Sequence, residues 1–316
     1  MKKVLITGAF GNLGLMCVEQ SLAIGYQLRC FDIDNPATRK AAKAFQGRVE
    51  AVFGDLRDEA LLDKLLEGVD AIIHNASLLP PLTESMPELA EAVNVTACRQ
   101  LIAAAEALPE PPVFVFPSSV TVFGSQQPND KVYTADDPVE ASDNYTRHKI
   151  TIEKALAESR LPWVVARVGV SVDARTLKTD RATFKKLLDV HPDNHLEYVH
   201  PKDVALAMCR AASEPSARRQ ILLLGGGKNC QITQREFMKV AFDALGLELP
   251  YTIHGREPFY THWMDTTESQ RILQFQRHDF ADYTQEMQQR LRLLRLLLAP
   301  LRFLLNPLLV VLLRRL

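Results

Sequence analysis

A tyrosine and a lysine lie four residues apart in the segment NYTRHK, residues 144–149. On a helix this spacing places Tyr145 and Lys149 on the same face. A phenol ordinarily ionises near pH ~10, but a nearby cation stabilises the phenolate and lowers the pKa. A phenol tuned in this way can take a proton from an alcohol or return one to a carbonyl. The alternative is a surface Tyr–Lys pair, and these two residues alone do not decide between them.

A glycine loop near the amino terminus offers a site for a diphosphate. The loop Thr7-Gly8-Ala9-Phe10-Gly11-Asn12-Leu13-Gly14 follows the apolar run KVLIT and precedes a helical pattern. A helix N-terminus supplies free N–H groups and a favourable dipole to phosphate oxygens. In such a loop Gly8 permits the tight turn, and Gly11 lets the phosphates approach the backbone. Gly14 allows the helix to pack closely on the strand. The alternative is a tight turn that binds nothing.

Acidic residues end the next two predicted strands. Asp32 follows QLRCF, 18 residues after Gly14, where a carboxylate accepts hydrogen bonds from the adenosine ribose and repels a 2′-phosphate. This favours NAD over NADP. Asp34 is a weaker candidate for the same role because it lies past the strand end. Asp55, in FGDL, either reaches the adenine or caps the helix that follows, and both interpretations stay open.

The scaffold that positions these residues is predicted to alternate strands and helices. Val- and Ile-rich runs are expected to be strands, and the segments between them helices, including one over 143–159 that carries Tyr145. This pattern predicts an α/β, Rossmann-type, doubly wound parallel sheet. Ligands bind at the carboxyl ends of such strands, where HNAS at residues 74–77 also lies. The predicted strands cover 3–7, 27–31, 49–53, 70–76, 113–119, 163–169 and 221–226.

Three regions are predicted along the chain. Residues 1–169 form the nucleotide-binding domain, to which 200–225 return. Residues 170–199 and 226–286 form a small C-terminal substrate lobe. An apolar, arginine-rich helical tail covers 287–316.

The composition is that of an ordinary globular chain, with 316 residues, 47% hydrophobic and 24% charged, and a net charge of −1. No nucleic-acid partner is expected. Five widely spaced cysteines without a CxxC pair predict neither disulfides nor a metal site, and indicate a reduced, cytoplasmic protein. The amino terminus, with an apolar run of four residues, is not expected to be a signal peptide.

Several motifs occur in a recognisable order: TGAFGNLG, Asp32, Asp55, HNA, FVFPSSVTVFG and YTRHK. Together they resemble the extended short-chain dehydrogenase/reductase family, also called the NAD-dependent epimerase/dehydratase family. The segments NVTACRQLIAAAE at 94–106 and YVHPKDVALAM at 198–208 are also similar to recurring segments of that family. The resemblance covers roughly residues 2–250.

The resemblance implies an enzyme with bound NAD and a Ser-Tyr-Lys site. Tyr145 is then the acid/base, Lys149 tunes it and binds the nicotinamide ribose, and Ser119 matches the catalytic serine better than Ser118 does. Val168 and Gly169 are implied near the nicotinamide carboxamide. The expected cofactor-binding residues are Gly8, Phe10, Gly11, Asn12, Leu13, Gly14, Asp32, Asp55, Leu56, Asn75, Ala76, Ser77, Lys149, Val168 and Gly169.

Two departures from the family pattern bear on the substrate. His148 stands where the family has a small residue, and we expect it to face solvent. Only 32 residues separate Arg167 from His200, which leaves less protein to hold a nucleotide diphosphate. We therefore expect a dehydrogenase or reductase acting on a hydrophobic secondary alcohol or ketone of sterol, isoprenoid or lipid type. The alternatives are a sugar or nucleotide-sugar epimerase or dehydratase and, less favoured, a non-catalytic NAD-responsive scaffold at a membrane.

The tail, LRLLRLLLAPLRFLLNPLLVVLLRRL at 291–316, is an electrostatic outlier. From residue 290 it holds six arginines and no acid, so residues 1–289 carry a net charge of −7. Its longest uncharged run, Phe303–Leu313, has 11 residues, short of the ~20 that span a bilayer. Arg292, Arg295, Arg302, Asn306 and Arg314 fall on one narrow arc of a helical wheel. This predicts peripheral contact of 290–316 with the inner face of a membrane; packing on the protein's own core or a homodimer partner is the alternative.

Overall fold

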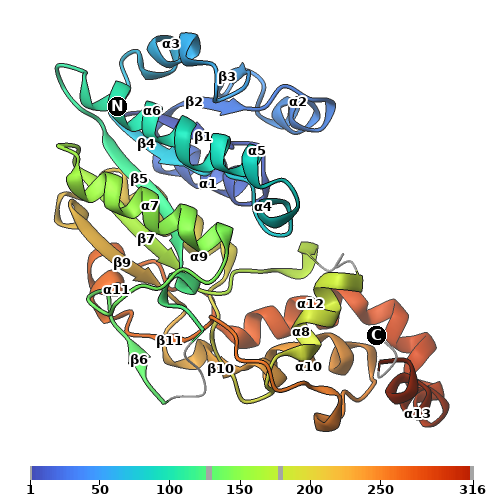
Figure 1. Cartoon of the computed structure of the whole chain (residues 1–316). Coiled ribbons are helices and arrows are strands. Elements are labelled where there is room, and N and C mark those ends of the chain that lie inside the picture. Colours follow the sequence, from blue (N-terminus) through green and yellow to red (C-terminus); the bar gives the residue numbers. More distant parts are fainter. Residues whose placement is uncertain (1, 126–129, 177–180, 314–316) are drawn as a thin grey trace.

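The computed structural model describes residues 2–125, 130–176 and 181–313 (Figure 1). Its centre is a seven-stranded sheet in the order β3-β2-β1-β4-β5-β7-β9, in which every pairing is parallel. The strand order reverses between β1 and β4, which makes the carboxyl ends of these two strands the expected ligand site. The sheet strands are β1 Lys3–Thr7, β2 Gln27–Asp32, β3 Glu50–Phe53, β4 Ala71–His74, β5 Val113–Ser119, β7 Trp163–Val168 and β9 Gln220–Leu224.

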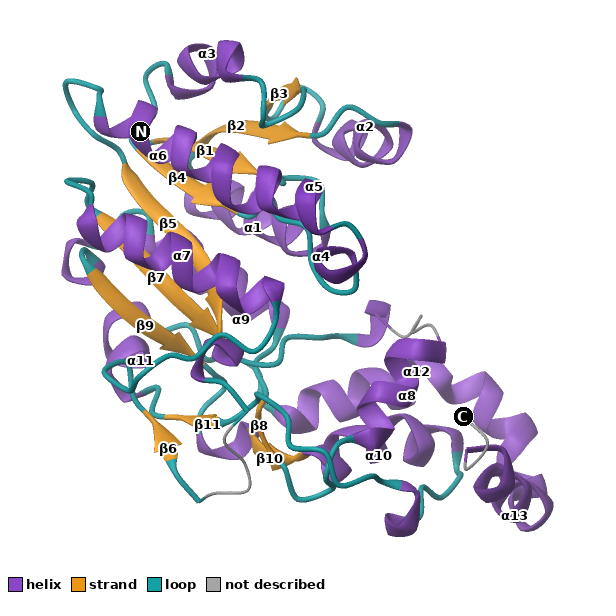
Figure 2. Cartoon of the chain, viewed as in Figure 1, coloured by secondary structure: helices purple, strands orange, loops and turns teal. Residues whose placement is uncertain are grey.

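Helices cover both faces of this sheet (Figure 2), as the sequence predicts. Alternate residues of one strand serve the two faces, since Val4 and Ile6 pack on one side and Leu5 on the other. The helices are α1 Asn12–Ile24, α2 Pro36–Ala42, α3 Leu62–Leu66, α4 Leu82–Ser85, α5 Pro87–Glu91, α6 Cys98–Glu106, α7 Asn144–Glu158, α8 Arg181–Asp189, α9 Pro201–Ala211, α10 Gln234–Leu245, α11 Thr267–Leu273, α12 Phe280–Leu298 and α13 Arg302–Leu313.

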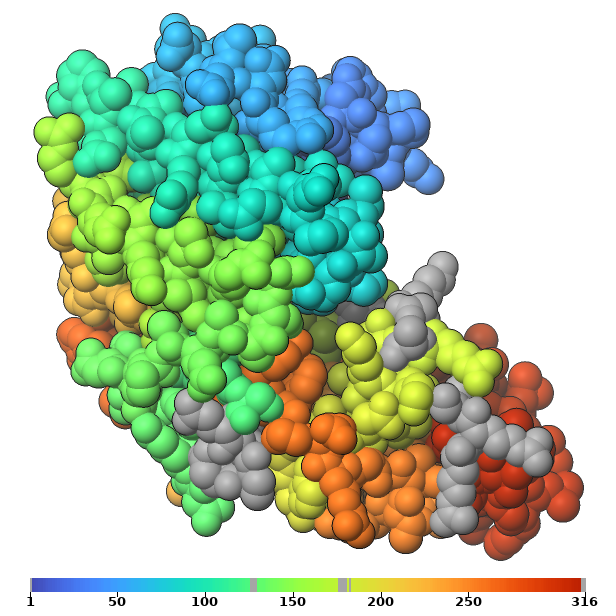
Figure 3. All heavy atoms as spheres, in the orientation of Figure 1, coloured from blue at the N-terminus to red at the C-terminus, as the bar shows by residue number. Residues whose placement is uncertain are grey.

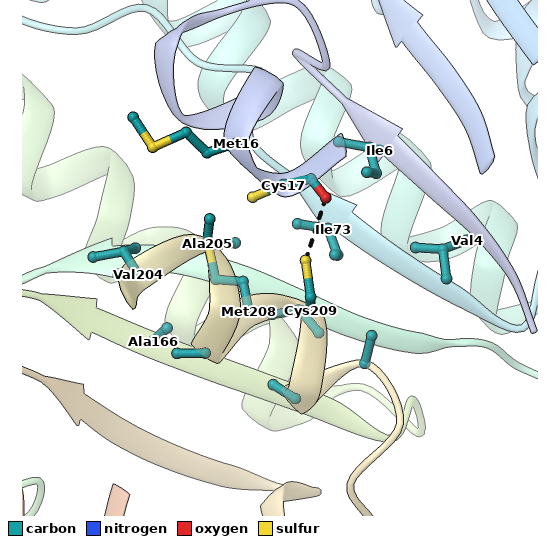
Figure 4. Packing of buried hydrophobic residues seen from close by; sticks show 14 of the residues in the cluster. Val4, Ile6, Met16, Cys17, Ile73, Ala166, Val204, Ala205, Met208 and Cys209 are labelled. Carbon is teal, nitrogen blue, oxygen red and sulfur yellow. Dashed lines mark hydrogen bonds between the residues drawn. The ribbon is translucent and has the colours of Figure 1, made fainter. Parts of the chain in front are cut away.

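One face of the sheet is covered by α1 and α9, which bring residues far apart in the sequence together. Met16 and Cys17 of α1 face Val204 and Met208 of α9 over the sheet residue Ile73 (Figure 4). The Cys209 thiol approaches the Cys17 carbonyl oxygen at 3.4 Å. The other face is covered by α3, α6 and α7. The segment after residue 200 therefore packs on the nucleotide-binding sheet.

Two of the segments between strands, which the sequence predicts to be helices, are less regular than that. Between β4 and β5, α5 is followed by a π-helical turn, Ala92–Ala97, and then by α6. Between β3 and β4, a 3₁₀ turn, Glu59–Leu61, is followed by α3. In contrast, the strand at 113–119 is as predicted, and a capping box of Thr233 and Glu236 begins α10.

A smaller lobe lies beside the carboxyl ends of the strands, with its own apolar core. Two short strands, β8 His195–Glu197 and β10 Gln231–Thr233, pair antiparallel within it. Its core joins these strands to α10 and α12 through residues that include Leu196, Ile232 and Met287. A second pair of short strands, β6 Val132–Tyr133 and β11 Trp263–Met264, is drawn below the sheet in Figure 2.

The tail begins inside this lobe. Helix α12 starts at Phe280, and its residues Tyr283, Met287 and Leu291 are buried in the lobe core. A 3₁₀ turn at Ala299–Leu301 then redirects the chain into α13, which contains Pro307. By length and composition the helical segment Phe280–Leu313 could cross a membrane, because its most apolar 18-residue window has a mean hydropathy of 2.2. The sequence prediction is the opposite because it counts only residues in an uncharged run, and Arg302 interrupts that run. The mean hydropathy over 18 residues stays high even when the window contains one arginine.

Candidate active site

The glycine loop joins β1 to α1 and is held tightly against β4. Gly8 has φ +61°, and a Cβ there would lie 2.8 Å from the Ala76 nitrogen. A Cβ on Gly14 would lie 2.0 Å from the Gly8 carbonyl oxygen, so α1 can pack this closely only on a glycine. A Cβ on Gly11, the N-cap of α1, would have one neighbour, at 3.5 Å. The loop thus leaves its backbone open on the side where a phosphate can approach.

Asp32 lies at the end of β2, next to this loop. Its Oδ2 accepts a hydrogen bond from the Phe10 N–H at 2.7 Å, and its Oδ1 accepts one from the Ile33 N–H at 2.8 Å. Burial raises the pKa of Asp32 above its ordinary value, although both backbone N–H groups oppose the shift. Asp34, the weaker candidate, is instead paired with Arg39 at 2.5 Å on the surface.

The next candidates, Asp55 and Leu56, do not line the cavity that most of the predicted site residues form. Asp55 is bonded to Arg57, whose guanidinium lowers the pKa of the carboxyl. Of the two interpretations of Asp55, the one in which it caps the following helix is wrong, because Asp58 accepts the capping N–H of Ala60 at 3.1 Å. The adenine contact stays a prediction. The Leu56 side chain packs in the sheet core, which leaves only its backbone for a cofactor.

The end of β4 presents polar groups to the same cavity. His74 is buried and bonded to the Thr7 hydroxyl at 2.9 Å, and burial lowers its pKa to about 3, so it is a neutral structural residue. Asn75 follows with both side-chain polar atoms buried and, apart from its approach to the Cys17 thiol, no hydrogen-bond partner among the described residues. Such an unsatisfied amide beside an open glycine loop fits a dinucleotide. The residues present therefore fit NAD.

Tyr145, Lys149 and Ser119 meet at the carboxyl end of β5. Asp143 caps α7 through a capping box with Thr146, which fixes the first turn and with it Tyr145. The Lys149 Nζ donates to the Pro117 carbonyl oxygen at 2.7 Å and lies 5.5 Å from the centre of the Tyr145 ring. The Ser119 hydroxyl is hydrogen-bonded to Tyr145 and accepts from the Thr121 hydroxyl at 2.9 Å.

The pKa of Tyr145 shifts in the opposite direction to the prediction. Desolvation in the cavity raises it to about 12, and the hydrogen bond from Ser119 only partly offsets this. Lys149 does not reverse the shift, because its ammonium group is bonded to Pro117 and is itself desolvated, which lowers its pKa to about 8. In the protein alone, Tyr145 is therefore a neutral phenol, suited to donating a proton.

Ser118, the neighbour of Ser119, points to the other side of β5. It donates to the buried carboxylate of Glu153, which is also paired with Arg167 at 2.8 Å. This buried group holds α7 against β5 and β7. The side-chain alternation of a strand thus leaves Ser119, rather than Ser118, beside Tyr145.

His148 is buried, with 2% of its surface exposed, so the expectation that it faces solvent is wrong. The end of α5 and the turn Ala92–Ala97 contact it: its Nδ1 lies 3.3 Å from the Asn94 amide nitrogen, and its Nε2 lies 2.9 Å from the Glu91 carboxylate. Asn94 in turn bonds both the N–H and the carbonyl oxygen of Leu78, at 2.7 and 2.8 Å. These contacts hold the loop after β4 over the cavity, a role that sequence reasoning missed although it singled out the segment beginning at Asn94.

The cavity that joins these groups has a volume of about 430 Å³ and opens between the sheet and the lobe, where Figure 3 shows a hollow side of the molecule. Most of the predicted site residues line it, but Phe10, Asp32, Asp55, Leu56 and Ala76 do not. The structure adds residues that the sequence did not single out, among them Leu79, Ser171 and Arg175. The predicted residues in the lining are Gly8, Gly11, Asn12, Leu13, Gly14, Asn75, Ser77, Ser119, Tyr145, Lys149, Val168 and Gly169.

The fold and this cavity define a dinucleotide-binding enzyme of the Rossmann type. Residues 4–169 match the model of the NAD dependent epimerase/dehydratase family, and the chain belongs to that family. The sequence resemblance to this family is therefore confirmed.

Two curated relatives illustrate the range of the similarity. Sterol-4-alpha-carboxylate 3-dehydrogenase (decarboxylating) of Dictyostelium discoideum is 26% identical over 260 residues, which cover 78% of this chain and 77% of the relative. D-erythronate dehydrogenase of Cupriavidus necator is 31% identical over 178 residues, or 52% of this chain and 53% of the relative.

Solved structures resemble the whole fold. A dTDP-glucose 4,6-dehydratase from Streptomyces venezuelae, crystallised with NAD, superposes with a TM-score of 0.76 at 22% identity. The superposition covers 92% of this chain and 97% of the dehydratase. At this identity the similarity concerns the fold.

Proposed function

We propose that the protein is an NAD-dependent dehydrogenase or reductase that transfers a hydride between a secondary alcohol or ketone and the cofactor. Its substrate is hydrophobic, of sterol, isoprenoid or lipid type. Family membership, the meeting of Ser119, Tyr145 and Lys149 in one cavity, and the presence of Leu79 in its lining support this assignment.

The cofactor is assigned to the half of the cavity under the glycine loop. The diphosphate is assigned to the open backbone at Gly11 and the start of α1. Asp32 is assigned to the adenosine ribose, and Asn75 to a polar group of the dinucleotide. When bound, NAD supplies the hydride acceptor and, in its oxidised form, a positive charge beside the tyrosine. Lys149 is assigned to the nicotinamide ribose.

Proton transfer is assigned to Tyr145. Its raised pKa keeps the phenol protonated near neutral pH, so it can protonate the oxygen of a ketone as a hydride arrives at carbon. In the opposite direction the phenolate is needed, and positive charge in the cavity favours it. Ser119, bonded to Tyr145, positions the substrate oxygen.

The observation that carries the substrate class is the lack of a free cation in the described lining. The lining cations are Lys149, bonded to Pro117, and Arg175, which is paired with Asp173 at 2.8 Å. An unpaired Arg or Lys side chain would strengthen the binding of a substrate diphosphate. Leu79 lines the cavity and is 55% exposed, which offers apolar surface to a substrate. The similarity to a sterol dehydrogenase points the same way.

A nucleotide-sugar epimerase or dehydratase is the second candidate, favoured by the fold shared with such enzymes. The outcomes differ, since a dehydrogenase converts NAD stoichiometrically and an epimerase regenerates it in each cycle.

An apolar substrate also favours an enzyme located at the cytoplasmic face of a membrane. Residues 290–316 are assigned as the membrane contact, and a homodimer through the same residues is the alternative.

The test is turnover by the wild type and by Tyr145→Phe. The wild type is offered sterol and isoprenoid alcohols and ketones, then nucleotide sugars, while the absorbance of the reduced nicotinamide is followed. Tyr145→Phe is expected to lose roughly 10²- to 10⁴-fold in rate while keeping NAD affinity. The control Tyr26→Phe removes a hydroxyl that donates to the Cys209 carbonyl oxygen, and neither residue lines the cavity.

Three results would count against the proposal. Turnover of nucleotide sugars without net NAD conversion supports the epimerase. Full activity in Tyr145→Phe refutes the proton-transfer role. NAD binding without turnover of any substrate supports the scaffold.

A further inference from the structure

The tail carries an apolar surface that nothing in the described protein covers. Single exposed apolar side chains are ordinary, but a contiguous group is not. In α12, α13 and the turn between them, ten large apolar residues are 47–77% exposed. They form the red end of the molecule in Figure 3. We call them the tail surface: Leu293, Leu294, Leu296, Leu297, Leu301, Phe303, Leu304, Leu308, Val311 and Leu312.

The spacing of these residues gives each helix one outward apolar face. In α12, Leu293, Leu296 and Leu297 stand at i, i+3 and i+4. In α13, residues 304, 308, 311 and 312 stand at i, i+4, i+7 and i+8. Residues at these spacings share a face of a helix. The exposure is therefore a property of two faces and not of scattered side chains.

The opposite sides of both helices are fixed to the lobe. Leu291 is buried in the lobe core, and the Arg295 guanidinium donates to the Asp243 carbonyl oxygen at 2.8 Å. In α13, the Asn306 side-chain oxygen accepts the Glu248 N–H at 3.2 Å, and Leu313 packs near Leu249. The tail surface is thus held in place on both sides of the bend.

The charges around this surface select its partner. Arg290, Arg292 and Arg302 are exposed on these helices, and residues 287–313 contain no acid. Two copies meeting symmetrically through this surface would bring their arginines together, which is unfavourable. An anionic bilayer accepts both the leucines and the arginines, each cation near the surface contributing about 1 kcal/mol.

We propose that the tail surface docks the protein on an anionic phospholipid bilayer, with α12 and α13 lying in the interface. This proposal rests on the proposed function, since an apolar substrate gives the enzyme a reason to bind a membrane, and it names the surface that contacts the membrane. Helix α13 has 12 residues and is about 18 Å long, against about 30 Å of bilayer core. Spanning would require α12 and α13 to straighten and leave the lobe.

The test is co-sedimentation of the full chain with phosphatidylcholine vesicles, with and without phosphatidylglycerol. The wild type is expected to bind the anionic vesicles and to dissociate with salt or alkaline carbonate. The double variant Leu297→Glu/Leu304→Glu is expected to lose at least tenfold in affinity. Arg292→Gln/Arg302→Gln should weaken binding to anionic vesicles only. The matched control is Ile24→Glu, an exposed apolar residue at the end of α1, which should bind like the wild type.

Each contrary result has its own meaning. Equal binding by the Leu297/Leu304 variant overturns the proposal. Resistance to carbonate identifies a spanning helix and overturns the interfacial placement. A dimer in light scattering that the same variant converts to a monomer, without vesicle binding, identifies a second copy as the partner. Tyr145→Phe should bind vesicles like the wild type, so failure of the enzymatic assignment is seen separately.

Discussion

Replacing Lys149 by methionine is expected to stabilise the protein while abolishing its activity. The lysine is buried and desolvated, and its pKa falls from 10.5 to about 8. A lowered folded pKa means that the unfolded chain binds the proton more tightly, so the charged lysine destabilises the fold below pH 8. The stability of the wild type then rises with pH between about 8 and 10.5. The shift corresponds to about 3 kcal/mol at neutral pH.

The net gain in Lys149→Met is smaller, because the Pro117 carbonyl oxygen loses its 2.7 Å partner. An unsatisfied buried acceptor costs about 1–3 kcal/mol. The pH dependence separates the two effects, since the lost hydrogen bond does not titrate in this range. Linkage predicts that the advantage of the variant is about 2 kcal/mol larger at pH 6.5 than at pH 9.5.

The assay is urea unfolding of the wild type and Lys149→Met at both pH values, followed by circular dichroism. Other titrating groups are common to the two proteins and cancel in the difference. Lys154→Met, on the exposed side of α7, is the control and should show no such pH dependence. A stability difference that is equal at pH 6.5 and 9.5 would refute the reasoning, because the lysine would then be fully charged in the fold.

Two further predictions concern the cofactor and the cavity loop. Asp32→Ser should lower the affinity for NAD about tenfold, because a charged hydrogen bond to the ribose is lost, and should reduce the ratio of NAD affinity to NADP affinity. Titration with both cofactors checks this, and the control Asp34→Ser should bind both like the wild type. A larger preference for NAD over NADP in Asp32→Ser would contradict the prediction. His148→Ala should release Asn94 from α7 and loosen the loop at Leu78, so that KM rises by a larger factor than kcat falls. A fall in kcat with KM unchanged would show that His148 acts on the chemistry and not on the loop.

Much of the sheet could be predicted from the sequence because local patterns determine it. The strand Val113–Ser119 and the helix Asn144–Glu158 follow from runs of apolar residues and from cap residues close in the chain. The glycine loop is predictable for the same reason, since Gly8 and Gly14 satisfy steric demands within one turn of strand and helix.

The features that could not be predicted depend on contacts distant in sequence. His148 is buried because a turn 54 residues earlier folds over it. The pKa of Tyr145 depends on desolvation, which spacing does not reveal. The tail docks through Arg295 to Asp243, 52 residues away, and no periodicity within the tail indicates this partner.

The place of β9 at the edge of the sheet has a consequence for folding. Val164–Val168 pair with Gln220–Leu224, and a segment of the lobe and α9 lie between them in the chain. Closing a loop of about 50 residues costs roughly 3.5 kcal/mol of chain entropy before any contact repays it. The pairs β1–β2, β2–β3, β4–β5 and β5–β7 are joined by shorter connections, so they can form before β9 is added. Until β9 arrives, β7 is an open edge that another chain can join. Newly made protein is therefore most prone to aggregate at β7.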